Sequence, residues 1–101
     1  MSARGIDIPK DDIARFCVKH GVRRLALFGS VLRDDFGADS DVDVLVEFEA
    51  GRKVGYLRLA GMELELSALL GRKVDLRTPA ELSRYFRDEV MRSAEVQYAT
   101  G

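Results

Sequence analysis

The stretch from Leu25 to Glu47 limits the possible folds of this chain more than any other segment. It opens inside an apolar run that predicts a short strand over residues 23–28, and Gly29-Ser30 then turns the chain into a predicted short helix. Alternating valines predict a second strand over residues 41–48, with the valines on one face. A strand, a turn into a helix and a half-buried second strand indicate a domain that mixes strands and helices.

The rest of the chain alternates helices and strands. Apolar residues at helical spacing predict two helices that each end at a glycine. The segment MELELS in the second helix also alternates like a strand, but the length of the apolar pattern favours helix. The fold class is therefore α+β (α/β), a small mixed sheet flanked by helices. The remaining expected elements are a helix over 8–20, a helix over 54–70 and a strand over 73–77. A last helix is expected to start at the capping sequence Thr78-Pro79-Ala80-Glu81 and to carry Leu82, Tyr85, Phe86 and Val90. Residues 95–98 form either a final strand or a frayed helix end.

Length and composition narrow the class of protein. The 101 residues suffice for one domain over 1–101, and the 47% of hydrophobic residues makes a packed core possible. With 16 basic and 17 acidic residues and no basic run, we expect no binding of extended nucleic acid. A single cysteine, Cys17, excludes an internal disulfide and suits the reducing cytoplasm. No segment is long and apolar enough for a membrane span, so we expect a cytoplasmic protein without membrane association.

Gly29 and Ser30 form a candidate phosphate-binding turn. Where a strand passes through Gly-Ser into a helix, backbone N–H groups and the positive end of the helix dipole attract phosphate. Glycine allows close approach to the backbone, and the Ser30 hydroxyl adds a donor. Taken alone, the same two residues also fit an ordinary turn with a serine helix cap.

Asp41 and Asp43 form a candidate metal site. They stand two apart in the second predicted strand, so both carboxylates point to the same face. Two such charges repel each other unless a cation lies between them, and Mg²⁺ prefers carboxylate and phosphate oxygens. The alternative is a solvated polar strand edge, but the valines of the opposite face indicate a buried strand.

Asp75 can add a third carboxylate. It lies between Val74 and Leu76 in the predicted strand over 73–77, so it faces the side opposite to them. If that strand lies beside the strand over 41–48, Asp75 joins the other two aspartates and could help hold a pair of metal ions. Equally, Asp75 could be a surface residue that pairs with Arg77 on the same face.

The complete pattern resembles the minimal nucleotidyltransferase (MNT) family of the DNA polymerase beta superfamily. Its parts are Gly29-Ser30, Asp41-x-Asp43 after ten intervening residues, and Asp75 in the sequence KVDL. The resemblance implies a nucleotidyltransferase fold like the polymerase beta palm. It also implies that Asp41 and Asp43 bind Mg²⁺, with two ions expected, and that Asp75 completes the metal site and helps to deprotonate the acceptor hydroxyl.

The same resemblance implies a nucleotide site. ATP would be the substrate, and its holders would be Gly29, Ser30, Arg33 and Ser40, although Arg33 could instead pair with the neighbouring Asp34 or Asp35. Arg77 departs from the family pattern, because relatives are expected to carry an apolar residue there.

The resemblance further implies a function and a partner. MNT proteins of this size are similar to the antitoxins of HEPN/MNT toxin–antitoxin pairs, which transfer AMP from ATP to a tyrosine of the HEPN ribonuclease. We therefore expect a type VII-like antitoxin that modifies a HEPN-type toxin, since the chain leaves no residues for an acceptor domain of its own. The alternatives are an antitoxin that neutralises its toxin by binding alone, and the catalytic subunit of a small-molecule or RNA nucleotidyltransferase whose acceptor is held by another chain.

The helix over 54–70 supports a partner independently. Leu57, Leu64 and Ala68 fall on the side opposite to the apolar stripe that contains Met62 and Leu66. A helix that is apolar on two sides is buried on both or carries an interface, with a toxin or with a second copy of this chain.

Overall fold

A computed structural model describes residues 2–3, 6–29, 41–51 and 53–100 of the chain. The sequence-predicted helix after Gly29 and the loop before Asp41 lie outside these residues. The elements are β1 (Ser2–Ala3), β2 (Ile6–Asp7), α1 (Lys10–His20), β3 (Val22–Phe28), β4 (Val42–Phe48), α2 (Tyr56–Leu70), β5 (Val74–Arg77), the short 3-10 helix η2 (Pro79–Glu81), α3 (Arg84–Ser93) and β6 (Glu95–Ala99).

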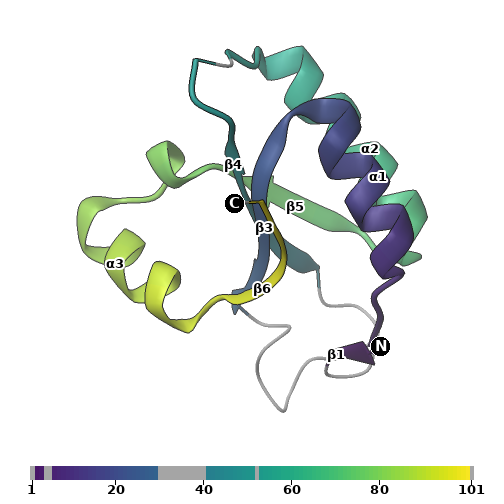
Figure 1. The fold of residues 1–101 in the computed structure, drawn as a ribbon. Coiled ribbons are helices and arrows are strands. Elements are labelled where there is room, and N and C mark those ends of the chain that lie inside the picture. The colour runs from purple at the N-terminus through teal and green to yellow at the C-terminus, as the bar shows by residue number, and fades with distance from the viewer. Residues whose placement is uncertain (1, 4–5, 30–40, 52, 101) are drawn as a thin grey trace.

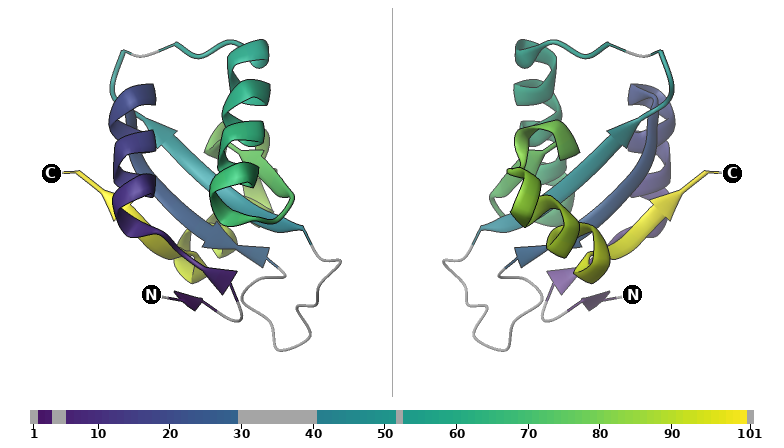
Figure 2. Two further views of the ribbon diagram at one scale, coloured as in Figure 1. Left: turned by 90° about the vertical axis from the view of Figure 1, so that its right-hand side faces the viewer. Right: turned by 90° about the vertical axis from the view of Figure 1, so that its left-hand side faces the viewer.

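The molecule is built on a four-stranded mixed sheet in the order β5-β4-β3-β6. β4 and β5 are parallel and are joined through α2, whereas β3 runs antiparallel to both β4 and β6. α1 and α2 cover one face of the sheet, and α3 lies on the other (Figures 1 and 2). This arrangement confirms the expected mixed sheet flanked by helices, and it settles the tail as a strand. None of the described helices is long and apolar enough to cross a membrane.

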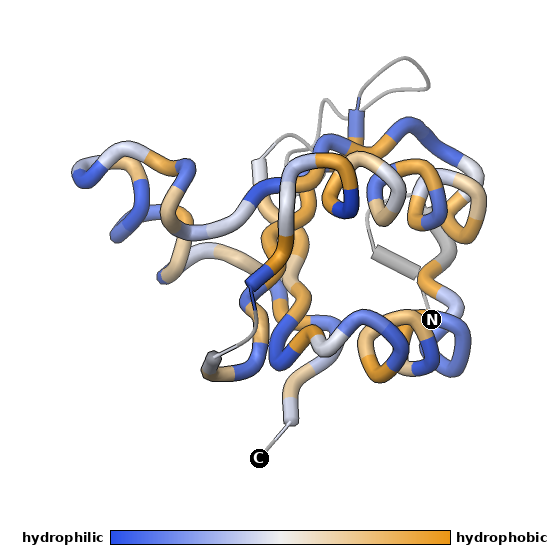
Figure 3. The backbone as a smooth tube through the Cα atoms, turned by 90° about the horizontal axis from the view of Figure 1, so that it is seen from above, coloured by the Kyte–Doolittle hydropathy of each residue, from blue (hydrophilic) through white to orange (hydrophobic). Residues whose placement is uncertain are grey.

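The main core lies between the sheet and the pair α1 and α2. Phe16 of α1 and Leu66 of α2 are buried against the valines of β4, which the sequence placed on one face. A smaller cluster of Phe28, Leu45 and Val90 lies on the α3 side. Figure 3 shows hydrophobic stretches along the sheet and along α1 and α2, while α3 at one side is largely hydrophilic.

The ends of α1 and α2 follow the sequence. Gly21 and Gly71 adopt left-handed φ angles of 69° and 67° directly after the last helical residues, a conformation that glycine reaches without the strain of a Cβ. The MELELS segment is helical, as its length predicted. Its polar residues bond the free edge of β5, because Glu63 Oε2 accepts from the N–H of Leu76 at 2.8 Å and Ser67 Oγ accepts from the N–H of Val74 at 3.0 Å.

The C-terminal helix differs from the expectation. The capping residues are present, since the Glu81 carboxylate accepts from the N–H of Thr78 at 3.1 Å, but η2 ends after one turn. Leu82 is extended, and Ser83 caps a separate helix by accepting from the N–H of Phe86 at 3.2 Å. The prediction of one helix from Thr78 was therefore wrong. Of the apolar residues expected on this helix, Val90 is buried, whereas Tyr85 and Phe86 are exposed.

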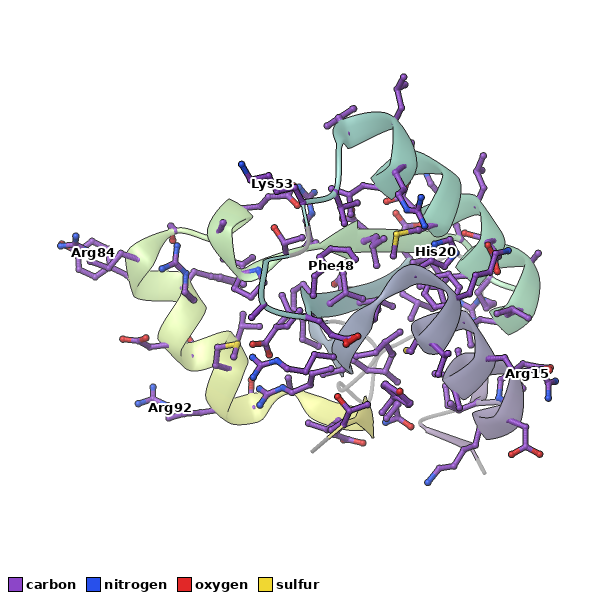
Figure 4. The ribbon with its side chains drawn as sticks, turned by 45° about the horizontal axis from the view of Figure 1, so that its top comes forward. Arg15, His20, Phe48, Lys53, Arg84 and Arg92 are labelled. Carbon is purple, nitrogen blue, oxygen red and sulfur yellow. The ribbon has the colours of Figure 1, made fainter. Side chains whose placement is uncertain are left out.

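His20 is a second departure. Its position at a helix end before Gly21 favours a solvated cap on the sequence alone, but the structure differs. The side chain is buried between α1 and α2 (Figure 4), where its Nε2 lies 3.0 Å from Oε1 of Glu65. Its ring also contacts that of Phe16. His20 therefore fastens the two helices to each other. Cys17 is fully buried, and burial raises the pKa of its thiol to about 12, so it stays protonated and unreactive.

The two apolar sides of α2 have different surroundings. Met62 and Leu66 are buried in the core, whereas Leu57 and Leu64 are 88% and 73% exposed. Leu57 and Leu64 therefore lie opposite the buried stripe, as the sequence predicted, and of the two alternatives for their side of α2 the structure shows an exposed apolar surface.

Replacing Leu66 with Ala is expected to lower the free energy of unfolding by about 2–5 kcal/mol, because it leaves a cavity in the core. The matched change Leu64→Ala on the exposed side should alter it by less than about 0.5 kcal/mol. Urea unfolding followed by circular dichroism measures both. Equal losses would mean that Leu64 is also a core residue in solution.

A pH-dependent contribution to stability is expected from Glu65. The contact with His20, and secondarily that with Lys19, holds the pKa of Glu65 below its ordinary value of 4.5. A carboxyl group with a lowered pKa in the folded state stabilises the protein above the unfolded pKa, and this stabilisation is lost as the pH falls through the folded pKa. Wild type should therefore exceed Glu65→Gln in unfolding free energy at pH about 7, and the difference should shrink at pH about 3. A difference independent of pH would contradict this assignment.

Candidate active site

The candidate residues share the face of the sheet on which α3 lies. β3 pairs with β4 so that Phe28 lies opposite Asp43, and β4 pairs with β5 so that Asp43 lies beside Asp75. Register partners in adjacent strands point to the same face of a sheet. The strand of Asp75 therefore adjoins the strand of Asp43, which is the arrangement that a shared metal site requires.

Gly29 brings the candidate phosphate turn against the carboxylates. It directly follows β3 and has a φ of 74°, which favours glycine. A Cβ at this position would lie 2.2 Å from Oδ2 of Asp43, so the backbone passes closer to the carboxylate than any other residue type would allow. The turn and the carboxylate are thus direct neighbours.

Of the remaining sequence-predicted site residues, the structure describes Asp41 but not the other three. Asp41 immediately precedes β4 and is exposed, two residues from Asp43. Ser30, Arg33 and Ser40 lie outside the described residues, so their assignment to the nucleotide remains a prediction.

Arg77 occupies the centre of the site. Its NH2 atom lies 3.1 Å from Oδ2 of Asp75, and its NH1 atom lies 4.0 Å from Oε2 of Glu81. The hydrogen bond with Asp75 is the main reason why the pKa of Arg77 is raised, and the charges of Glu81 and Asp43 add to it. The ion pair between Asp75 and Arg77, which the sequence allowed as an alternative to a metal site, is therefore formed.

A hollow of about 350 Å³ lies over these residues, between the sheet, η2 and the beginning of α3. Its polar side holds the carboxylates of Asp43, Asp75 and Glu81 together with Arg77, and its apolar side is formed by Phe28, Leu82 and Phe86. A second hollow of about 260 Å³, between β5 and α2, shares Asp75, Arg77 and Glu81 with it. Arg77 thus borders both spaces.

The donor set suits Mg²⁺ only in part. Adjacent carboxylates of Asp43 and Asp75 beside a phosphate-type turn match an ion that takes one or two carboxylates together with substrate phosphates. However, within residues 2–3, 6–29, 41–51 and 53–100, no group of three or more His, Cys, Asp or Glu side chains is placed to hold a metal ion. In this structure Arg77 holds Asp75, and the binding of Mg²⁺ by Asp41, Asp43 and Asp75 stays a prediction.

Sequence reasoning did not find the wall of the hollow. Leu82 and Phe86 were expected in one helix, yet the extended Leu82 lies outside α3, and both residues line the hollow beside Asp43 and Asp75. The extended conformation of Leu82 has no clear local signal, because the capping residues before it also permit a longer helix.

Comparison with known proteins agrees with this geometry. Residues 11–96 match the family described as nucleotidyltransferase domain. The chain is 35% identical to a Methanocaldococcus jannaschii protein assigned as a protein adenylyltransferase, over 84% of this chain and 89% of the relative. It is 40% identical to protein adenylyltransferase MntA of Thermococcus cleftensis, over 79% of this chain and 77% of the relative.

Solved structures share the fold. One described as a minimal nucleotidyltransferase is 39% identical, with a TM-score of 0.70 over 84% of this chain and 85% of that chain. A chain of a toxin–antitoxin complex with AMP-PNP has a TM-score of 0.74 over 92% of this chain and 75% of its own length; at 18% identity it supports the fold alone. The protein described here belongs to the nucleotidyltransferase domain family, as its resemblance to the minimal nucleotidyltransferases predicted, and it is an enzyme of that class.

Proposed function

We propose that this nucleotidyltransferase transfers AMP from ATP to a tyrosine hydroxyl of a HEPN-type toxin and thereby acts as its antitoxin. The observation that carries the proposal is the row formed by Asp43 and Asp75 beside the Gly29 turn, which offers carboxylates and a phosphate-binding backbone at one place. The names of the relatives support AMP transfer to protein. One structural neighbour is an MNT antitoxin in complex with a Shewanella oneidensis HEPN toxin that carries AMP.

The residues would divide the reaction between them. The backbone at Gly29 and the side chain of Ser30 would hold the triphosphate, and Asp41, Asp43 and Asp75 would hold Mg²⁺. The acceptor oxygen attacks the α-phosphorus, the bond from this phosphorus to the pyrophosphate oxygen breaks, and the hydroxyl proton passes to the carboxylate of Asp75. Bound Mg²⁺ would supply a Lewis acid for the charge that develops on the phosphate oxygens.

The apolar side of the hollow supports an aromatic acceptor. Phe28, Leu82 and Phe86 form a wall next to Asp43 and Asp75, so a phenol ring could lie on the wall with its hydroxyl toward the carboxylates. A serine acceptor would leave the same apolar surface uncovered.

Mass spectrometry of a HEPN partner after incubation with this protein, ATP and Mg²⁺ tests the proposal. A mass increase of one AMP on a tyrosine is expected with wild type, and none is expected with Asp43→Asn, which removes a metal-binding charge but keeps the shape of the side chain. Because the substitution also removes a like charge near Asp75, the free energy of unfolding should stay the same or rise.

Three outcomes would contradict the assignment. Full transfer by Asp43→Asn would mean that the site lies elsewhere. Neutralisation of the toxin without modification, and without metal-dependent affinity for ATP, would indicate an antitoxin that acts by binding alone. Transfer to a small molecule or an RNA instead of the toxin would indicate a different acceptor.

Gly29→Ala should abolish transfer, because the added Cβ would collide with Oδ2 of Asp43 and displace the turn or the carboxylate. Gly71→Ala is the matched control, because Gly71 has a similar φ of 67° and nothing within 4 Å of the position of its Cβ. Both variants should lose about 1–2 kcal/mol of unfolding free energy from the left-handed backbone. Only Gly29→Ala should also lose nucleotide affinity, as measured by calorimetric titration with ATP and Mg²⁺. If Gly29→Ala and Gly71→Ala changed the affinity for ATP to the same extent, Gly29 would not be part of the nucleotide site.

A further inference from the structure

Arg77 is bound to the carboxylates of the site before any substrate arrives. It contacts Asp75 at 3.1 Å and approaches Glu81 at 4.0 Å, and its side chain is 46% exposed at the border of both hollows. The transfer mechanism gives no role to this side chain. It lies in the same strand as Asp75 and lines the larger hollow together with Asp43, Asp75 and Glu81.

The guanidinium of Arg77 offsets the repulsion among the carboxylates of the site. Asp43 and Asp75 are side-by-side register partners, and Glu81 lines the same hollow. Carboxylates at such positions repel each other unless a cation lies among them. Arg77 provides a positive charge that does not depend on the concentration of any ion, because a guanidinium stays protonated at all physiological pH values.

We propose that Arg77 is a positioning residue that occupies Asp75 in the empty enzyme and leaves it when metal and nucleotide bind together. A metal ion that arrives alone must displace the guanidinium from Asp75, which lowers its affinity. A metal ion that arrives with a triphosphate brings a second partner for the released guanidinium, because phosphate oxygens form strong charge-assisted hydrogen bonds with arginine.

The consequence is a coupling between the two ligands. Triphosphate should strengthen metal binding more in wild type than in a variant without the guanidinium, and by linkage the metal should strengthen nucleotide binding to the same extent. Arg77 would thus keep the site closed to free divalent cations and open it to the metal–nucleotide complex. This inference rests on the metal site of the proposed function.

Titration with Mn²⁺ alone, followed by electron paramagnetic resonance, tests the proposal without any catalytic turnover. Arg77→Leu should bind Mn²⁺ about fivefold more tightly than wild type, the scale of an exposed ion pair. Arg77→Lys keeps the charge and should lie between the two. In the presence of ATP this order of Mn²⁺ affinities should reverse or vanish, because Arg77→Leu lacks the guanidinium that contacts the triphosphate.

Two controls separate the ion pair from a general change of charge. Arg84→Leu removes an equal charge from the beginning of α3, where the side chain points away from the sheet (Figure 4), and should leave the affinity for Mn²⁺ unchanged. In an Asp75→Asn background, Arg77→Leu should no longer raise the affinity for Mn²⁺, because the pair is already absent.

Each result decides between distinct conclusions. If Arg77→Leu and wild type bind Mn²⁺ equally, or if the effect persists in the Asp75→Asn background, Arg77 does not occupy Asp75 and the inference is overturned. If wild type and all variants fail to bind Mn²⁺ even with ATP, the metal site itself is wrong and the proposed function falls with it.

Discussion

The parallel pairing of β4 with β5 is the constraint on which the site depends. The pairing sets Asp43 beside Asp75 although α2 separates them in the sequence, and a shift by one residue would turn Asp75 to the opposite face. The register is held from both sides of β5. On one side the Val42 N–H donates to the Lys73 carbonyl at 2.8 Å, and on the other the α2 side chains bond the free edge. α2 thus connects β4 to β5 and also helps to hold β5 in the register that places Asp75 beside Asp43.

Much of the fold was predictable because local signals agreed with tertiary packing. The alternation of valines in β4, the glycines that end α1 and α2, and the length of α2 each had one consistent interpretation. The MELELS alternation was ambiguous because two of its polar positions serve an edge strand that only the folded protein brings near. The break at Leu82 and the burial of His20 were missed since both depend on partners distant in the sequence, such as Glu65 for His20.

The candidate site was predictable to a different degree. The motif residues Gly29, Asp43 and Asp75 lie together, because a short turn and a strand register place them. The sequence left two roles open for Asp75, metal ligand and partner of Arg77, and the structure shows the pair. These roles are compatible if they alternate in time, which spacing along one strand cannot reveal. The wall of the hollow was not predictable, because it is formed by a segment that returns over the sheet from the C-terminal side.

The two faces of the sheet serve different ends. The face toward α1 and α2 holds the larger core, so it provides most of the apolar burial that stabilises the domain. On the face toward α3, the small cluster of Phe28 and Leu45 with Val90 of α3 is buried, and beside it lies the open hollow over the carboxylates. No described residue of η2 or α3 belongs to the main core, and segments with few buried contacts open at a lower free-energy cost than the core does. Asp75 is therefore open through the larger hollow on the α3 side, and it also borders the smaller hollow between β5 and α2.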